Sequence, residues 1–97
     1  MNNNLVCYLF TKFDNKKSIL EFIKYYKKYS SGVKHTLLIC FKLLDQQTVS
    51  KYQVEGIKVI PWTVNDVEDI NNMLELKVDG IISDFPDRVI GLSNENK

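Results

Sequence analysis

Short apolar segments alternate with amphipathic ones along this chain. Four segments are rich in β-branched, aromatic and leucine side chains: Asn4 to Phe10, Thr36 to Lys42, Ile57 to Trp62 and Val78 to Ser83. Apolar runs of this length are typical of strands that are covered on both faces of a sheet. Pro61 lies near the end of the third run, where its missing N–H disturbs the ladder least. The pattern therefore predicts four strands.

The first two segments between these strands have helical periodicity. From Ser18 to about Gly32, apolar residues recur at the spacing of one helix face, and lysines occupy the other face. Asp45 is placed to cap a second, weaker helix over 46–54, which is expected to stop near Gly56. The sequence therefore predicts a helix in each of these two connections.

The third connection is predicted to be a helix that Asn65 opens. Its inner stripe is expected to be Val67, Ile70 and Leu74, which follow one another at helical spacing, with Met73 behind them. After the fourth strand we expect a short helical turn over 87–91 and then a polar tail that frays.

The alternation of strands with helices indicates an α/β fold. We predict four parallel strands alternating with helices through right-handed connections, as half of a (β/α)₈ barrel or as a small open sheet. A chain of 97 residues supports one core, so residues 1–97 are expected to form a single domain. Both arrangements leave two unpaired sheet edges, through which the chain could form a homo-oligomer.

The composition is that of a globular protein. Hydrophobic residues make up 44% of the chain and charged residues 26%, close to ordinary averages. The longest apolar run, Leu37 to Phe41, is far shorter than the roughly 20 residues that cross a bilayer. The first residues also lack the layout of a signal peptide. We therefore expect no membrane span, no nucleic acid partner and a cytoplasmic location.

Charge is divided unevenly along the chain. The net charge is +1, but residues 1–43 hold eight lysines against two acids (+6), and residues 44–97 hold five basic residues against ten acids (−5). Such a division is typical of two solvated faces, and it also fits halves of different origin. Cys7 and Cys40 lie in apolar segments, as small core residues do. Two cysteines and one histidine offer no zinc spacing, so no metal site is predicted.

The second half of the chain carries the most specific pattern. Residues 59–65 have the sequence VIPWTVN, and residues 78–87 have VDGIISDFPD. These stretches and their spacing resemble the last βαβ unit of the glycerophosphodiester phosphodiesterase family. The resemblance covers about residues 45–91, and it departs at Lys77, where the family often has glycine. It implies the closing part of a (β/α)₈ barrel, which in full needs about 250 residues.

The resemblance implies hydrolysis of a phosphoric diester in glycerophospholipid metabolism, with a glycerophosphodiester as substrate. In such barrels functional side chains follow the carboxyl ends of strands. Trp62 and Asp84 occupy such positions and are the predicted substrate-binding residues. Trp62 would pack against a glycerol group or else cover the barrel mouth. Asp84 would face the substrate or else bond backbone N–H groups of the turn over 85–87.

No catalytic residue is predicted in this chain. The family uses His-Arg-Gly and Glu-x-Asp motifs from early strands, and neither motif is present. The single histidine, His35, is followed by threonine and not by Arg-Gly. The family implies a divalent cation, Ca²⁺ or Mg²⁺, but no cofactor is predicted for this chain itself. We therefore expect a family member that is inactive alone.

A second resemblance concerns the first 44 residues. Residues 22–39, FIKYYKKYSSGVKHTLLI, which lie ahead of Lys42, resemble the opening βαβ unit of family 2 type glycosyltransferases. This resemblance implies a nucleotide-sugar-binding module and a junction near residue 44 between two ancestries. A third hypothesis is an α/β domain that binds no ligand and self-associates.

Overall fold

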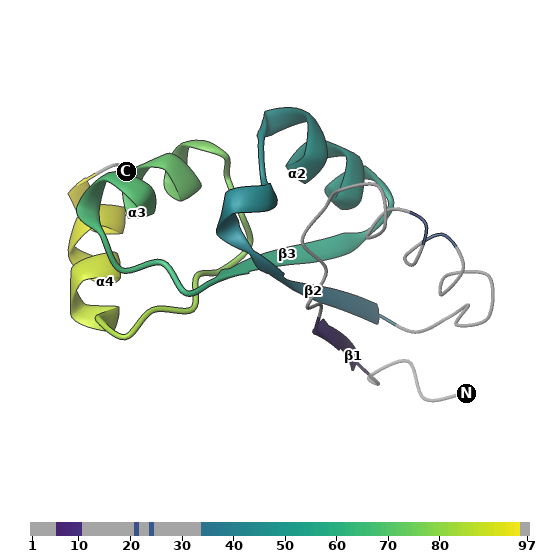
Figure 1. The fold of residues 1–97 in the computed structure, drawn as a ribbon, viewed down its shortest axis with the longest axis horizontal. Helices are drawn as coiled ribbons and strands as arrows, with labels where there is room; N and C mark the ends of the chain where they lie inside the picture. Colours follow the sequence, from purple (N-terminus) through teal and green to yellow (C-terminus); the bar gives the residue numbers. More distant parts are fainter. Residues whose placement is uncertain (1–5, 11–20, 22–23, 25–33, 96–97) are drawn as a thin grey trace.

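The computed structural model describes residues 6–10, 21, 24 and 34–95 of the chain (Figure 1). The helix predicted from Ser18 lies outside this part, apart from Glu21 and Lys24, which are helical and exposed. The strands and helices follow in the order β1 (Val6–Phe10), β2 (Lys34–Cys40), the 3₁₀ helix η1 (Phe41–Leu43), α2 (Gln46–Val54), β3 (Ile57–Trp62), α3 (Val67–Glu75) and α4 (Pro86–Glu95).

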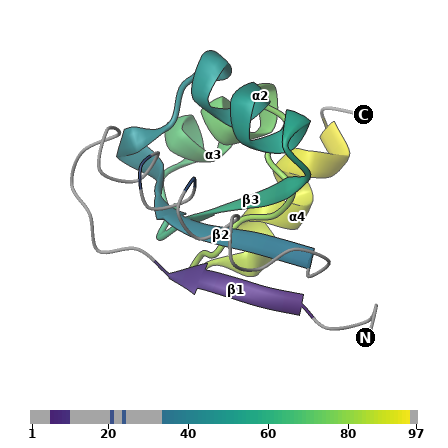
Figure 2. The same cartoon turned by 90° about the vertical axis from the view of Figure 1, so that its right-hand side faces the viewer.

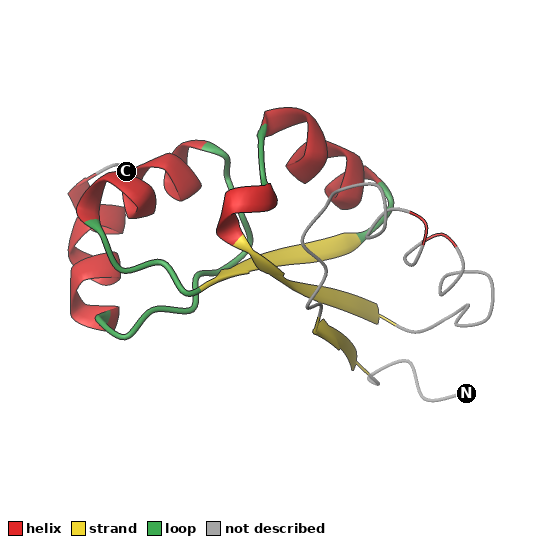
Figure 3. Cartoon of the chain, in the orientation of Figure 1, coloured by secondary structure: helices red, strands yellow, loops and turns green. Residues whose placement is uncertain are grey.

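The strands form a parallel sheet in the order β1-β2-β3, which confirms the α/β class and the parallel arrangement (Figures 2 and 3). Strand β1 pairs with β2 from Val6 opposite Lys34 onward. Strand β2 pairs with β3 from His35 opposite Ile57 to Cys40 opposite Trp62. The carboxyl ends of β2 and β3 therefore lie at the same edge of the sheet.

The prediction of a fourth strand over Val78 to Ser83 is wrong. The sheet of the described residues has three strands. The segment does run beside β3, because Asp79 N–H donates to Val59 O and Ile82 N–H donates to Pro61 O, each at 2.9 Å. A parallel ladder also needs N–H donors from β3. Val59 N–H donates instead to Asp79 Oδ2 at 2.7 Å, and Pro61 has no N–H. One side chain and one proline thus prevent a regular ladder.

The edge segment 78–83 is also tied to α2. Gln53 Nε2 donates to Lys77 O at 2.9 Å and to Asp79 Oδ2 at 3.1 Å. With the bond from Val59 N–H, the side chain of Asp79 receives hydrogen bonds from both β3 and α2. The preceding loop residue, Lys77, has a φ of 58°, in the left-handed region that favours glycine.

Helix α2 begins and ends where the sequence predicts. Thr48 N–H donates to Asp45 Oδ1 at 2.8 Å, so Asp45 is the N-cap. Gly56, with a φ of 82°, follows the C-terminal end. The helix covers one face of the sheet (Figure 1). The buried cluster between them consists of Leu37, Ile39, Tyr52, Ile57 and Val59.

Helix α3 begins two residues after Asn65, so the predicted N-cap is wrong. The N-cap position is Asp66, which makes no side-chain capping bond. The side chain of Asn65 bonds Ser83 and Asp84 instead of capping the helix. The inner face consists of the buried Ile70 and Met73, whereas Val67 is 49% exposed. Helix α4 continues to Glu95 through the residues expected to fray.

The α3 and α4 helices lie beyond the carboxyl end of β3 (Figure 1). They enclose a second buried cluster of Val64, Ile70 and Met73. Two half-buried residues, Leu44 and Val78, pack against both clusters.

The face of the sheet opposite α2 carries a different set of side chains. Leu38, Cys40, Ile60 and Trp62 lie on this inner face, because they alternate with the buried residues of β2 and β3. All four are half-buried, and none belongs to either cluster formed by the described residues.

None of the described helices is long and apolar enough to cross a membrane.

Candidate functional site

Trp62 is the last residue of β3 and lies at the carboxyl end of the sheet. It pairs with Cys40, the last residue of β2, and its side chain is half-buried. An indole in this place presents an apolar surface at the sheet end. The structure thus positions Trp62 as a strand-end residue, where the sequence placed it.

Asn65 connects the loop after β3 with the loop after the edge segment. Its Oδ1 accepts from Ser83 Oγ at 3.1 Å and from Asp84 N–H at 2.9 Å. Its Nδ2 donates to Asp84 Oδ2 at 3.0 Å. In addition, Val64 N–H donates to Ile82 O at 2.9 Å. One side-chain amide therefore holds the two loops together at the edge that Trp62 occupies.

Asp84 lies in this edge with an exposed side chain. The alternative was that Asp84 bonds backbone N–H groups of the turn over 85–87. For the N–H group of Phe85 this alternative is wrong. Phe85 N–H donates to Ser83 Oγ at 3.0 Å, and the Asp84 carboxylate accepts from Asn65. The amide fixes one carboxylate oxygen and leaves the side chain at the surface, where it can accept bonds from hydroxyl groups of a ligand.

Arg88, in the first turns of α4, was not singled out from the sequence. Its guanidinium donates to Asn65 O at 2.5 Å and lies over the Phe85 ring, 4.4 Å from the ring centroid. The edge therefore carries a carboxylate and a cation, both fixed through Asn65. The spacing of an arginine three residues after an aromatic residue was the available signal, but it is too common to indicate such a role.

Groups that could cleave a phosphodiester do not gather at this edge among the described residues. No three His, Cys, Asp or Glu side chains of that part lie close enough to hold a metal ion. His35 is in β2, five positions before Cys40, which places it about 16 Å from the carboxyl end at roughly 3.3 Å per residue. His35 thus lies at the opposite end of the sheet from Trp62.

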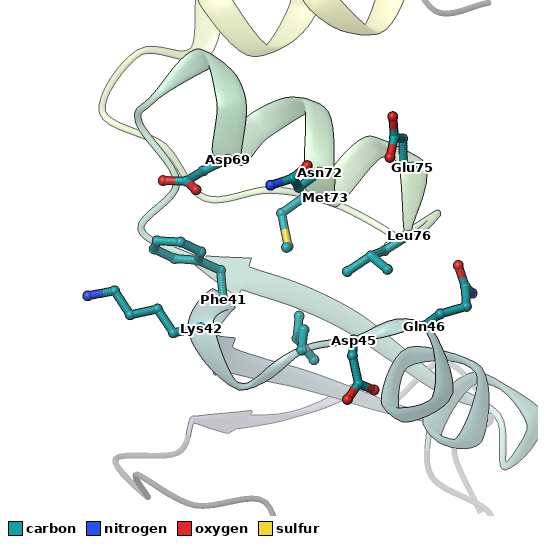
Figure 4. Close-up of a pocket in the computed structure, with 10 residues that line it drawn as sticks. Phe41, Lys42, Asp45, Gln46, Asp69, Asn72, Met73, Glu75 and Leu76 are labelled. Carbon is teal, nitrogen blue, oxygen red and sulfur yellow. The ribbon is translucent and has the colours of Figure 1, made fainter.

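A cavity of about 420 Å³ lies elsewhere, between η1 with the start of α2 on one side and α3 on the other. Figure 4 shows Phe41 facing Met73 across it, whereas the carboxylate of Asp45 points away from α3. Its lining includes three carboxylates, Asp45, Asp69 and Glu75, and one lysine, Lys42. Neither Trp62 nor Asp84 lines this cavity, so the strand-end site is distinct from it.

A family model matches residues 5–88 of the chain, that of the glycerophosphoryl diester phosphodiesterase family. The chain belongs to this family. The phosphodiesterase resemblance of the sequence is thereby confirmed.

Phosphodiesterases of two bacteria are among the similar proteins. A glycerophosphodiester phosphodiesterase of Bacillus altitudinis is 42% identical over 54 residues, which are 56% of this chain and 22% of that protein. One of Caldanaerobacter subterraneus is 49% identical over 37 residues, 38% of this chain and 15% of that protein. A dermonecrotic toxin of the spider Loxosceles variegata is 30% identical over 69 residues, 69% of this chain and 25% of that protein. The chain thus spans a quarter or less of these relatives.

A solved structure assigned to the phosphodiesterase family, from Silicibacter pomeroyi DSS-3, has the same fold. The TM-score is 0.67 at 24% sequence identity, and the match covers 94% of this chain and 30% of that chain. The family model extends to both sides of residue 44, and it gives no support to a glycosyltransferase resemblance of the first 44 residues. A junction near residue 44 stays a prediction.

Proposed function

We propose that this phosphodiesterase-family chain binds a glycerophosphodiester at the carboxyl edge of its sheet and does not hydrolyse it unaided. The observation that carries the proposal is that Asn65 fixes Asp84 beside the loop that follows Trp62. Both predicted binding residues thus lie at the end of the sheet where barrels of this architecture bind their ligands.

The chemistry of the edge suits a glycerol group attached to a phosphate. The indole of Trp62 offers an apolar face to the C–H groups of glycerol, and the Asp84 carboxylate accepts bonds from hydroxyl groups. Arg88 places a positive charge on the same edge, although its guanidinium is partly used by Asn65. These contacts orient a ligand but supply no proton transfer.

Hydrolysis of an unactivated phosphodiester needs a positioned proton donor and stabilisation of developing charge, usually by a divalent cation. The residues of the described part do not fit such a cation, because no three carboxylate, imidazole or thiol side chains among them come together as a metal ion would need. No step through a metal ion is therefore assigned to this chain, and unaided turnover is not expected.

Binding is tested by the fluorescence of Trp62, the single tryptophan of the chain, during titration with glycerophosphocholine. We expect a saturable change in emission. Calorimetry with Trp62→Ala and Asp84→Asn should show weaker binding, by about tenfold each. Ile90→Ala, which alters an exposed residue of α4, is the matched control and should bind normally. Normal binding by both Trp62→Ala and Asp84→Asn would refute the site.

Activity is tested separately, by choline release from glycerophosphocholine with Ca²⁺ or Mg²⁺ present. We expect no turnover by the purified chain. Turnover that disappears in Trp62→Ala would overturn the proposed inactivity while supporting the site. Titration with uridine and guanosine diphosphate sugars tests the nucleotide-sugar alternative, and saturable binding of either would favour it.

A further inference from the structure

The pair Asp79-Gly80 is the one place in the chain where an aspartate or asparagine precedes a glycine. At such a pair the backbone nitrogen of the glycine can attack the side-chain carboxyl group of the aspartate, because glycine has no Cβ to hinder the approach. The Asp79 side chain is exposed, so water can reach the reacting groups. Whether the pair rearranges therefore depends on how firmly the structure holds it.

The rearrangement has two steps. In the first, a C–N bond forms between the Gly80 nitrogen and Cγ of Asp79, and one carboxyl oxygen leaves as water together with the amide proton and a proton from the carboxyl group. In the second, water opens the resulting succinimide ring at one of its two carbonyl groups. Opening at Cγ restores aspartate, whereas opening at the main-chain carbonyl gives isoaspartate, in which the chain continues through Cγ. The water that is lost is regained, so the mass does not change and no other reactant is needed.

The structure fastens Asp79 to a single residue of β3 through both its side chain and its main chain. The carboxylate accepts a 2.7 Å bond from Val59 N–H, and Asp79 N–H donates to Val59 O at 2.9 Å. Ring closure has to turn the side chain onto the Gly80 nitrogen and convert the charged carboxylate to a neutral imide carbonyl. Both changes act against these bonds, of which the one to the carboxylate is charge-assisted.

Helix α2 holds the same loop through Gln53. Its Nε2 donates to Asp79 Oδ2 at 3.1 Å and to Lys77 O at 2.9 Å. On the other side of the pair, a Cβ added at Gly80 would lie 3.5 Å from the Ile60 side chain, so Gly80 lies against β3. The peptide group between Asp79 and Gly80 is thus held from α2 and from β3.

We propose that Asp79 is a site of isoaspartate formation, which the bonds from β3 and α2 keep unreacted while the segment 78–83 stays attached. Local opening of this segment releases the carboxylate and starts the rearrangement. Isoaspartate places an additional methylene group in the main chain, so the bonds with Val59 cannot form again in the original geometry. The modification is therefore a lasting record that this edge of the sheet has opened, and it does not depend on the proposed ligand binding.

The test compares the folded chain with the same chain in guanidinium chloride, both incubated for several weeks at neutral pH. Trypsin then releases residues 78–88, VDGIISDFPDR. The isoaspartyl form of this peptide has the same mass but a different retention time, and electron-transfer fragmentation locates the altered residue. We expect conversion to be at least about tenfold slower in the folded chain, because it requires local opening. Equal rates in the two conditions would overturn the proposal.

The role of α2 is tested with two glutamine variants. Gln53→Ala removes both bonds from the helix and should speed conversion of the folded chain by about fivefold. Gln46→Ala is the matched control, because Gln46 lies on the same helix and its Nε2 donates to Ser50 Oγ instead, and it should convert at the parent rate. If circular dichroism shows that Gln53→Ala does not fold, Gln53→Glu takes its place, since it keeps the side-chain length and repels the carboxylate. Equal rates for the Gln53 variant and Gln46→Ala would overturn the proposal.

Gly80→Ala tests the chemistry separately from the fold. The φ of Gly80 lies outside the left-handed region, and the added Cβ would make an ordinary contact with Ile60, so the variant should fold. In guanidinium chloride it should convert severalfold more slowly than the parent chain, because the Cβ hinders the attacking nitrogen. Isoaspartate that forms at Asp84 or Asp87 instead of Asp79 would contradict the assignment. None of these measurements involves glycerophosphocholine, so this proposal and the proposed function can fail independently.

Discussion

The carboxylate of Asp79 accepts the β3 hydrogen bond that a backbone carbonyl would accept in a regular ladder. Mutating Asp79 therefore tests how the segment 78–83 is held against β3. The carboxylate accepts a 2.7 Å bond from Val59 N–H and a 3.1 Å bond from Gln53. A hydrogen bond from a half-buried backbone N–H to a charged acceptor contributes about 1.5 to 3 kcal/mol, and the more exposed amide bond contributes about 0.5 kcal/mol. We therefore expect Asp79→Ala to lower the free energy of unfolding by about 2 to 3 kcal/mol.

The assay is urea unfolding followed by circular dichroism, at a protein concentration where one molecular mass prevails. Asp79→Asn keeps an acceptor oxygen near Val59 N–H and should lose only about half as much stability. Gln53→Ala removes the exposed bond alone and should cost less than about 1 kcal/mol. Hydrogen exchange at the Val59 amide should accelerate in Asp79→Ala but not in Gln53→Ala. An Asp79→Ala variant within about 0.5 kcal/mol of the parent chain would refute this account.

Three further outcomes follow from the described residues. Burial, with a smaller effect of a nearby carboxylate, raises the pKa of Tyr52 from 10.0 to about 12. The folded state then binds the proton more tightly, so stability should fall by roughly 2 to 3 kcal/mol as the pH rises from 10 to 12, and Tyr52→Phe should abolish this fall. Lys77→Gly should raise the unfolding free energy by about 0.5 to 1 kcal/mol, because φ is 58° there. Gly56→Ala should lower the unfolding free energy by about 1 kcal/mol, because φ is 82° there. Two variants with the same melting temperature would contradict the argument. Asn65→Ala should cost about 1 to 2 kcal/mol and weaken glycerophosphocholine binding because Asp84 is no longer fixed, and calorimetry that shows unchanged affinity would rule out this positioning role.

The sequence predicted those parts of the fold that local chemistry determines. Helix α2, with Asp45 as its cap, and strand β3, over Ile57–Trp62, have the predicted bounds. These segments are fixed by a capping side chain, by an apolar run and by Gly56. Such signals act over a few residues and can be recognised without knowledge of the tertiary structure.

Two of the failures, at Asn65 and at the segment 78–83, occurred where a side chain bonds a residue distant in the sequence. Asn65 has the composition of an N-cap, yet its amide bonds Ser83 and Asp84, so α3 begins later. The segment 78–83 has the composition of a strand, yet Asp79 and Pro61 prevent the ladder. Nothing local distinguishes these outcomes, because the partners lie about twenty positions away and tertiary contacts override propensity.

The candidate site shows the same division. Trp62 was recognisable because it ends a strand within a family pattern, and its binding role, like that of Asp84, stays a prediction. Arg88 could not be found in this way, since its partner is the backbone carbonyl of Asn65. A carbonyl group carries no residue-specific signal in the sequence.

Leu44 and Val78, which pack against both buried clusters, couple the unfolding of the sheet with α2 to the unfolding of α3 and α4. The two parts, the sheet with α2 and the helix pair α3 and α4, should therefore melt together only while both side chains are intact. Truncation of Leu44 to alanine would then broaden the thermal transition, with the helix pair opening at a lower temperature than the sheet. Whether the sheet with α2 unfolds separately from α3 and α4 would thus depend on two residues that contact both clusters.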